Sequence, residues 1–185
     1  MKRLVVGLSG ASGCPLAIDL LSVMREQPDW ETHLVWSDGF ARSLSYESDK
    51  TMDELCAMAD VVYRNDDLGA AIASGTFQTE GMVVIPCSMK TVAGIACGYS
   101  DNLLLRAADV TIKEGRRLVL AARESPLSPI HLKNMLYLSE LGVRIVPPMI
   151  AYYANTDSVQ TVTRQAVGRV LNEFGISAPG FQRWA

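Results

Sequence analysis

Three short stretches carry the residues that could do chemistry. The first, from Gly7 to Gly13, reads G-L-S-G-A-S-G and places glycines and serines directly after an apolar run. Glycines let the backbone approach a ligand closely, and hydroxyl and N–H groups at a helix start favour an anion. The stretch predicts a loop that binds a nucleotide or a phosphorylated cofactor; a tight strand-to-helix turn without a ligand is the alternative.

The other two stretches come after later apolar runs. Residues 88–91 read S-M-K-T and bring hydroxyls and a lysine to the start of a helical pattern, which makes a second anion site. Arg123 and Glu124 come directly after the run 117–122. An exposed ion pair of this kind is worth only about 0–1 kcal/mol. Beside two anion-binding loops, a phosphate-binding arginine with a neighbouring proton carrier is the better interpretation.

Alternating strand and helix patterns must position these stretches. Strands are predicted at the N-terminus and over 31–36, 61–63, 82–86, 117–122 and 143–146, and helical patterns separate them. Helices between strands imply right-handed crossovers and a sheet covered on both faces. The fold is therefore predicted as a doubly wound α/β sandwich of three layers, Rossmann- or flavodoxin-like, with a mainly parallel sheet of about six strands. Its carboxyl edge would gather Ser12, Ser37, Ser88 and Arg123.

Two details of this pattern are specific enough to test. Asp101 is a candidate cap for a helix over 101–113, and a capping box is expected to open a short helix at Thr51. Glu47 is then expected in a loop between two helices, where an acid on pattern alone is a solvated surface group.

Composition limits the function classes. The 185 residues predict one α/β domain over 1–185, with an irregular tail over about 177–185. A net charge of −3 gives no basic face for nucleic acid, and no apolar stretch approaches the ~20 residues that span a bilayer. The apolar content of 49% instead favours a subunit interface. Four cysteines without C-x-x-C pairing predict neither a zinc site nor disulfides, but reduced thiols in a cytoplasmic protein.

The sequence of the first loop also limits which cofactor it could bind. An NAD site expects G-x-G-x-x-G and an acid that closes the second strand, whereas this strand closes with Ser37 before Asp38, which keeps NAD as an alternative. The G-K-[ST] triplet of P-loop enzymes is absent. A flavin phosphate held by serines and helix N-termini fits better.

Several longer motifs resemble the UbiX flavin prenyltransferase family, including its members associated with phenylacrylic and hydroxyarylic acid decarboxylases. The motifs are G-A-S-G, S-Y-E-S-D, A-S-G-T-F, P-C-S-M-K-T-V-A-G-I-A-C-G, L-R-A-A-D-V-T-I-K-E, V-L-A-A-R-E-S-P-L-S-P-I-H-L-K-N-M and P-P-M-I-A-Y-Y. The resemblance covers nearly the whole chain. It implies metal-independent transfer of a dimethylallyl group from dimethylallyl phosphate to reduced FMN. The product would be prenylated FMN, used by a UbiD-type aromatic acid decarboxylase, and the assembly would be a homo-oligomer, a dodecamer.

The resemblance also implies roles for individual residues. The FMN-binding set comprises Gly10, Ala11, Ser12, Ser37, Ser88, Met89, Lys90, Thr91 and Arg123. The set that grips the prenyl phosphate comprises Arg106, Lys113, Tyr153 and Arg169. The catalytic set comprises Ser12, Glu47, Lys113, Arg123 and Glu124, in which the two glutamates move protons.

The chain departs from the family pattern at two places. Gly115 comes after Lys113-Glu114 where many relatives have arginine, and the linker 65–69 lacks the tryptophan that some relatives place against the prenyl group. Three other functions compete with the prenyltransferase. An FMN-dependent oxidative decarboxylase of a cysteine-bearing substrate would need a catalytic histidine, and neither His33 nor His131 is well placed. A non-enzymatic flavin-carrying subunit would need no second phosphate clamp, and direct decarboxylation lacks an evident base.

Overall fold

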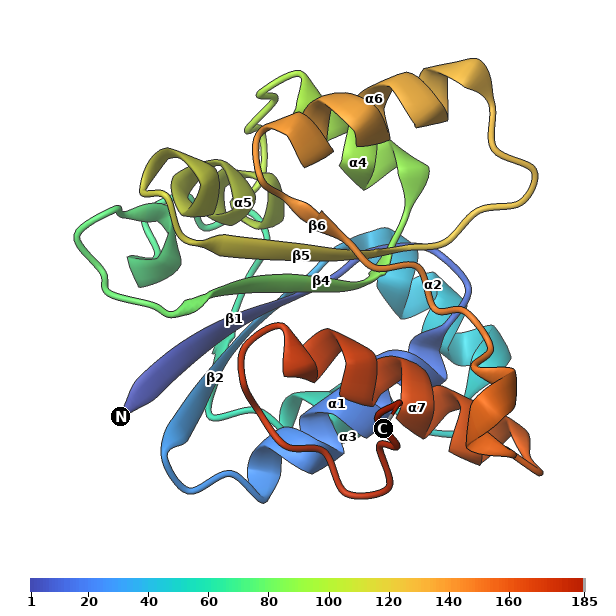
Figure 1. Ribbon diagram of the computed structural model, residues 1–185. Coiled ribbons are helices and arrows are strands. Elements are labelled where there is room, and N and C mark those ends of the chain that lie inside the picture. Colours follow the sequence, from blue (N-terminus) through green and yellow to red (C-terminus); the bar gives the residue numbers. More distant parts are fainter. Residues whose placement is uncertain (185) are drawn as a thin grey trace.

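Six strands form one sheet through the middle of the molecule in the computed structural model, which describes residues 1–184 (Figure 1). The order across the sheet is β3-β2-β1-β4-β5-β6, and each neighbouring pair is parallel. The strands are β1 (Lys2–Leu8), β2 (Trp30–Trp36), β3 (Val61–Tyr63), β4 (Gly81–Cys87), β5 (Arg117–Ala122) and β6 (Arg144–Ile145). The predicted doubly wound α/β class is confirmed.

Helices cover both faces of this sheet, as crossovers between parallel strands require (Figure 1). One layer contains α1 (Cys14–Arg25), α2 (Asp38–Glu47), α3 (Met52–Cys56) and α7 (Val159–Asn172). The other contains α4 (Met89–Ala96), α5 (Leu103–Lys113) and α6 (Pro129–Glu140). Two 3₁₀ turns, η1 (Ala71–Ala73) and η2 (Tyr152–Ala154), lie in the connections. Among residues 1–184, no helix has both the length and the apolar character that crossing a bilayer requires.

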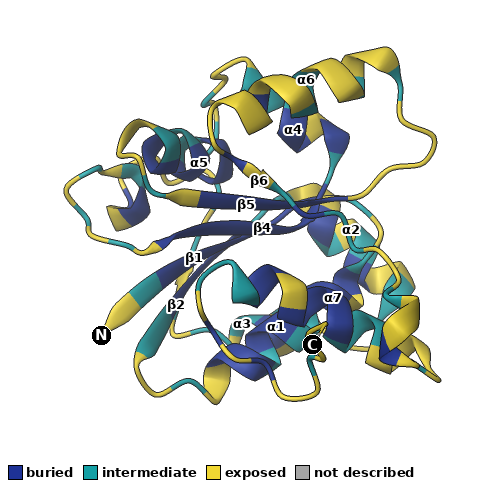
Figure 2. Cartoon of the chain, viewed as in Figure 1, coloured by how far each residue is buried: buried dark blue, intermediate teal, exposed yellow. Residues whose placement is uncertain are grey.

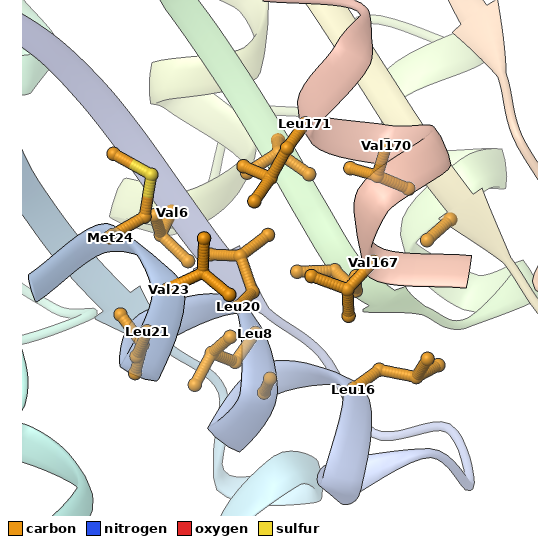
Figure 3. Close-up of a cluster of buried hydrophobic side chains, with 14 of the residues drawn as sticks. Val6, Leu8, Leu16, Leu20, Leu21, Val23, Met24, Val167, Val170 and Leu171 are labelled. Carbon is orange, nitrogen blue, oxygen red and sulfur yellow. The ribbon is translucent and has the colours of Figure 1, made fainter. Parts of the chain in front are cut away.

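The core is divided by the sheet into two apolar clusters. Leu4, Val6 and Leu8 of β1 belong to one cluster and Val5 to the other, because successive side chains of a strand point to opposite faces. Figure 3 shows the first cluster, in which α1 and α7 meet above β1. Each fully buried aliphatic side chain contributes about 1.5–3 kcal/mol relative to an exposed one, so this packing fixes the loops that leave the sheet.

Burial is uneven between the elements (Figure 2). Every residue of β4 is buried, whereas Leu138 is the one buried residue of α6. The outer face of α6 exposes large apolar side chains, namely Ile130, Leu132, Leu136 and Tyr137. Several large exposed apolar side chains on one helix are typical of an interface with another protein.

Side-chain caps set where the helices begin. Ser88 accepts from the Thr91 N–H, and Thr51 forms the predicted capping box of α3. The predicted cap of α5 was wrong by one residue: the Asn102 side chain accepts from the Leu105 N–H, and Asp101 does not cap. Each such cap is worth about 1 kcal/mol.

Two further features differ from the sequence-based expectations. Glu47 is the last residue of α2 and does not lie in a loop, because the helix continues up to Ser48. The tail after Ile176 packs on its own chain. Gln165 exchanges two hydrogen bonds with the backbone of Gln182, at 2.8 and 2.9 Å, and Phe181 lies against α7. This part of the tail is irregular, as predicted, but it is held in place.

Candidate functional site

The carboxyl ends of β1, β2, β4 and β5 bring four loops to one edge of the sheet, at the right of Figure 1. Ser9 ties the first loop to the third, because its Oγ accepts from the Ser88 N–H at 2.8 Å. The Ser37 N–H donates to Leu8 at 3.0 Å, and the Arg123 N–H donates to Cys87 at 3.1 Å. The backbone of the sheet therefore positions each predicted loop directly.

The first and second loops are in backbone contact. A Cβ on Gly10 would lie 2.8 Å from the Gly39 Cα, so a side chain at residue 10 would push the two loops apart. Gly10 also lines the cavity that these loops border. The glycine is thus explained by this close approach of two chain segments.

A cavity of about 530 Å³, which we call the 88–91 cavity, opens at this edge. The predicted residues in its wall are Gly10, Ser37, Ser88, Lys90 and Thr91. The helix starts of α2 and α4 both border it, so N–H groups and the Lys90 ammonium favour an anion there. Among residues 1–184, neither Lys90 nor Arg123 forms an ion pair with an acidic side chain.

The opposite wall of the 88–91 cavity was not predicted. It is formed by Asn65, Cys97, Tyr99, Asn102 and Leu104, with several neighbours. Asn65 holds the start of α5, since its side-chain oxygen accepts from the Leu104 N–H at 2.9 Å. Its signal in the sequence was its place just after β3, where the same strand-end rule applies.

A second hollow, of about 420 Å³, borders the same edge, and we call it the 12–47 hollow. Its polar side chains include Ser12, Glu47 and Arg123, and its wall is largely apolar, formed by Leu16, Pro148, Val159, Val162 and Ala166. An apolar wall with a few convergent polar groups is typical of a site that holds a small organic molecule. The hollow therefore combines an acid, a hydroxyl and a cation around apolar surface.

Glu47 is ionised at neutral pH. Burial raises the pKa of this carboxyl, but hydrogen bonds from the Gly13 N–H, the Ser12 hydroxyl and the Cys14 N–H outweigh burial and lower the pKa below its ordinary value. Both N–H groups donate to Oε2 at 2.8 Å from the first turn of α1. Glu47 can therefore accept a proton, with Ser12 beside it.

The cysteines near the site are thiols. Burial, with the charge of Glu47 added, raises the pKa of Cys14 to about 12, and complete burial raises the pKa of Cys87 to about 12. Neither is a nucleophile at neutral pH, and both side chains are buried.

Arg123 and Glu124 lie exposed at the end of β5. The Glu124 carboxylate accepts from the Ser125 N–H at 3.0 Å, so it is turned toward its own loop. Arg123 borders the 12–47 hollow, where a guanidinium can bind a phosphate.

The residues predicted for the prenyl phosphate do not meet within one chain. Arg106 and Lys113 lie on α5, which runs back from the carboxyl edge, so Lys113 ends at the opposite edge. Arg169 lies in the last turn of α7 and pairs with Glu173. Tyr153 lies in η2 and packs against the edge of Trp184, with ring centroids 5.3 Å apart.

The two histidines lie outside both cavities. His33 is buried in β2, where its Nδ1 lies 2.9 Å from the Tyr63 hydroxyl. His131 takes part in the capping box of α6 with Ser128. Among residues 1–184, no three His, Cys, Asp or Glu side chains are grouped to hold a metal ion.

Comparisons with known proteins match this chain over its length. A protein family described as Flavoprotein matches residues 1–171. The flavin prenyltransferase LpdB of Lactiplantibacillus plantarum is 50% identical over 184 residues, which cover 100% of this chain and 98% of the relative.

Two crystal structures are also similar along the whole chain. A dodecameric FMN-dependent UbiX-like decarboxylase from Escherichia coli O157:H7 has a TM-score of 0.98 and 49% identity, and the match covers 100% of both chains. AnUbiX (PadA1), in complex with FMN and dimethylallyl pyrophosphate, has a TM-score of 0.96 and 43% identity, covering 100% of this chain and 97% of that one.

Proposed function

Because the chain belongs to the flavoprotein family and, within it, to the UbiX-like flavin prenyltransferases, we propose that it transfers a dimethylallyl group from dimethylallyl phosphate to reduced FMN. The observation that carries this proposal is the pair of cavities on one sheet edge. One offers serines, a lysine and helix starts, and the other offers an ionised acid on an apolar wall. This arrangement suits a phosphorylated ring in one cavity and a short apolar chain in the other.

The residues of the 88–91 cavity fit FMN. Gly10 and Gly39 put backbone without side chains in the cavity wall, and Ser37, Ser88 and Lys90 supply donors for the phosphate. When bound, reduced FMN supplies the nucleophilic ring that receives the prenyl group. In this proposal Ala11, Met89, Thr91 and Arg123 complete its site.

The residues of the 12–47 hollow handle protons and charge. Glu47 and Ser12 take up the proton that is released as the new bond forms, since Glu47 is ionised. As the allylic C–O bond breaks, the phosphate leaves with the electron pair, and Arg123 stabilises the charge that develops on it. Glu124 moves a proton to the departing phosphate.

The remaining phosphate ligands come from neighbouring subunits in this proposal. Lys113 and Arg169 lie at the edge opposite the two cavities, so a second copy of the chain must bring them to the donor. The exposed apolar face of α6 supports such an assembly, as does the dodecameric relative from E. coli O157:H7. Tyr153 and Arg106 belong to the same group of donor ligands.

An anaerobic reaction with reduced FMN tests the proposal. The purified protein is incubated with dimethylallyl phosphate or, in a second arm, with the pyrophosphate that is bound in AnUbiX (PadA1), and the flavin product is weighed. In the dimethylallyl phosphate arm, we expect the mass of the flavin to rise by one dimethylallyl group. An unchanged flavin mass in both arms would contradict the proposal and leave the flavin-carrying subunit as the alternative.

Two variants check the residue assignments in the same assay. Arg123→Ala and Glu124→Gln are expected to keep the circular dichroism spectrum, since both side chains are exposed, and to slow turnover. Wild-type rates in both would show that these two residues do not act on the phosphate.

The proposal also includes the enzyme that uses prenylated FMN as its cofactor. Prenylated FMN would serve a UbiD-type aromatic acid decarboxylase, and adding the product to such an apo-decarboxylase should restore its activity. The cysteine decarboxylase is not favoured, because His33 is buried in the sheet and His131 caps α6. The four free thiols are compatible with a reducing compartment such as the cytoplasm.

A further inference from the structure

The segment from Ala73 to Gln78, which we call the 73–78 segment, contains no strand and is held by arginine side chains. Arg116 donates through Nη2 to the Gly75 carbonyl at 2.5 Å and through Nη1 to the Phe77 carbonyl at 2.8 Å. Arg116 is half-buried, whereas its neighbour Arg117 is exposed. A planar guanidinium can hold two carbonyls at once in fixed geometry, which a lysine ammonium cannot do.

Other arginines fix the two ends of the same segment. Arg106 Nε donates to the Ala73 carbonyl at 3.2 Å. At the other end, Arg3 lies over the Phe77 ring, 4.7 Å from its centroid. The backbone at Gly75 is therefore held in one position although it belongs to no regular element.

The side chains of Lys113 and Glu114 lie directly against the backbone of Gly75. A Cβ at residue 75 would lie 2.7 Å from the Lys113 Nζ and closer still to the Glu114 carboxylate, and these two groups form an ion pair. The Lys113 ammonium thus lies beside both the Glu114 carboxylate and the Gly75 backbone. A free lysine side chain samples many rotamers, so these contacts preorganise the charge.

We propose that Arg116 is a positioning residue for Lys113: it fixes the Gly75 backbone and thereby sets where the Lys113 ammonium meets the phosphate of the prenyl donor. The inference rests on the proposed function, because it takes Lys113 as a ligand of that phosphate. The charge of Arg116 also acts on Glu114: the pKa of this carboxyl is lowered first by its hydrogen bond with Lys113, and Arg116 adds a smaller effect. Glu114 therefore stays ionised as the partner of Lys113.

Steady-state kinetics of the assembled enzyme test this role. Arg116→Lys, Arg116→Gln and Gly75→Ala are expected to raise the KM for dimethylallyl phosphate about 10- to 100-fold, as for a binding group moved by about 1 Å. The Kd of FMN should stay unchanged, because no residue of the 73–78 segment lines the 88–91 cavity. Gly75→Ala is the cleaner variant: no positive φ is involved, and the atoms it displaces are the ends of flexible side chains.

A matched control and a double variant separate positioning from stability. Arg117→Gln removes an adjacent, exposed arginine and should leave the KM at the wild-type value. In a Lys113→Met background, Arg116→Gln should raise the donor KM no further, which a general loss of stability would not reproduce.

Three outcomes decide the matter. A rise in donor KM that disappears in the Lys113→Met background supports the positioning role. If the wild type prenylates FMN, two results overturn the positioning role alone. One is an unchanged donor KM in Arg116→Gln, and the other is an equal rise in donor KM when Arg116→Gln is added to Lys113→Met. Failure of the wild type to prenylate FMN overturns the proposed function and this inference with it.

Discussion

The carboxyl edge of the sheet and its amino edge use polar residues in different ways. At the carboxyl edge, Ser37, Ser88 and Arg123 come directly after strands, and the backbone of the sheet brings them together in one chain. At the amino edge, Lys113 and Arg169 end their helices and rest against acids of their own chain. The topology of a parallel sheet therefore brings the residues of the carboxyl edge together within one chain, whereas in our proposal the residues of the amino edge reach a site only when chains assemble.

Removing the base at the carboxyl edge should have the largest effect. Glu47→Gln keeps an oxygen that can accept from the first turn of α1, but it removes the group that takes up a proton. We expect kcat to fall about 10²- to 10⁴-fold, with the Kd of FMN unchanged. Anaerobic product formation measures this, and a kcat within twofold of the wild type would exclude Glu47 as the base.

Mixed oligomers should show whether one site combines residues of the two edges from different chains. Glu47→Gln and Lys113→Met chains, each much slower than the wild type alone, are co-expressed at equal amounts with different tags, and mixed oligomers are purified. If the residues of one site come from different chains, on the order of one quarter of the sites are intact in a random symmetric assembly. If each site uses Glu47 and Lys113 of the same chain, the mixed oligomers turn over as slowly as the two parent variants.

The smallest expected effect is on stability and depends on pH. The pKa of Glu47 is lower in the folded chain than its ordinary value, although burial opposes this, so Glu47 stabilises the fold above its unfolded pKa and loses this effect as the pH falls. In urea unfolding at pH 7, the free energy of unfolding of the wild type should exceed that of Glu47→Gln by about 0.3–1 kcal/mol. This difference should shrink below about pH 4. A difference that does not change with pH would show that the helix-start contact is not electrostatic.

The two edges also differ in how far the sequence could predict them. Ser88 and Arg123 were predicted at one edge because each comes directly after an apolar run, and periodicity is enough to find such positions. The end of α2 at Glu47 and the cap at Asn102 were each misplaced by about one residue, since local patterns define helix ends poorly.

Contacts between distant segments had no local signal. The approach of Gly10 to Gly39 and the grip of Arg116 on Gly75 join residues 29 and 41 positions apart in sequence. Lys113 was proposed from the family resemblance alone, because a lysine at a helix end is otherwise an ordinary surface residue. Periodicity locates the residues at the end of a strand, but it does not show which distant loop those residues will touch.

The four thiols of the chain differ in a way that serves experiment. Cys14 and Cys87 are buried, and their raised pKa values keep both thiols protonated at neutral pH. Cys56 is half-buried, and burial raises the pKa of its thiol. Cys97 is exposed and lines the 88–91 cavity. A maleimide dye should therefore attach first at the mouth of that cavity, so the native chain carries its own attachment point for a fluorescent reporter of occupancy.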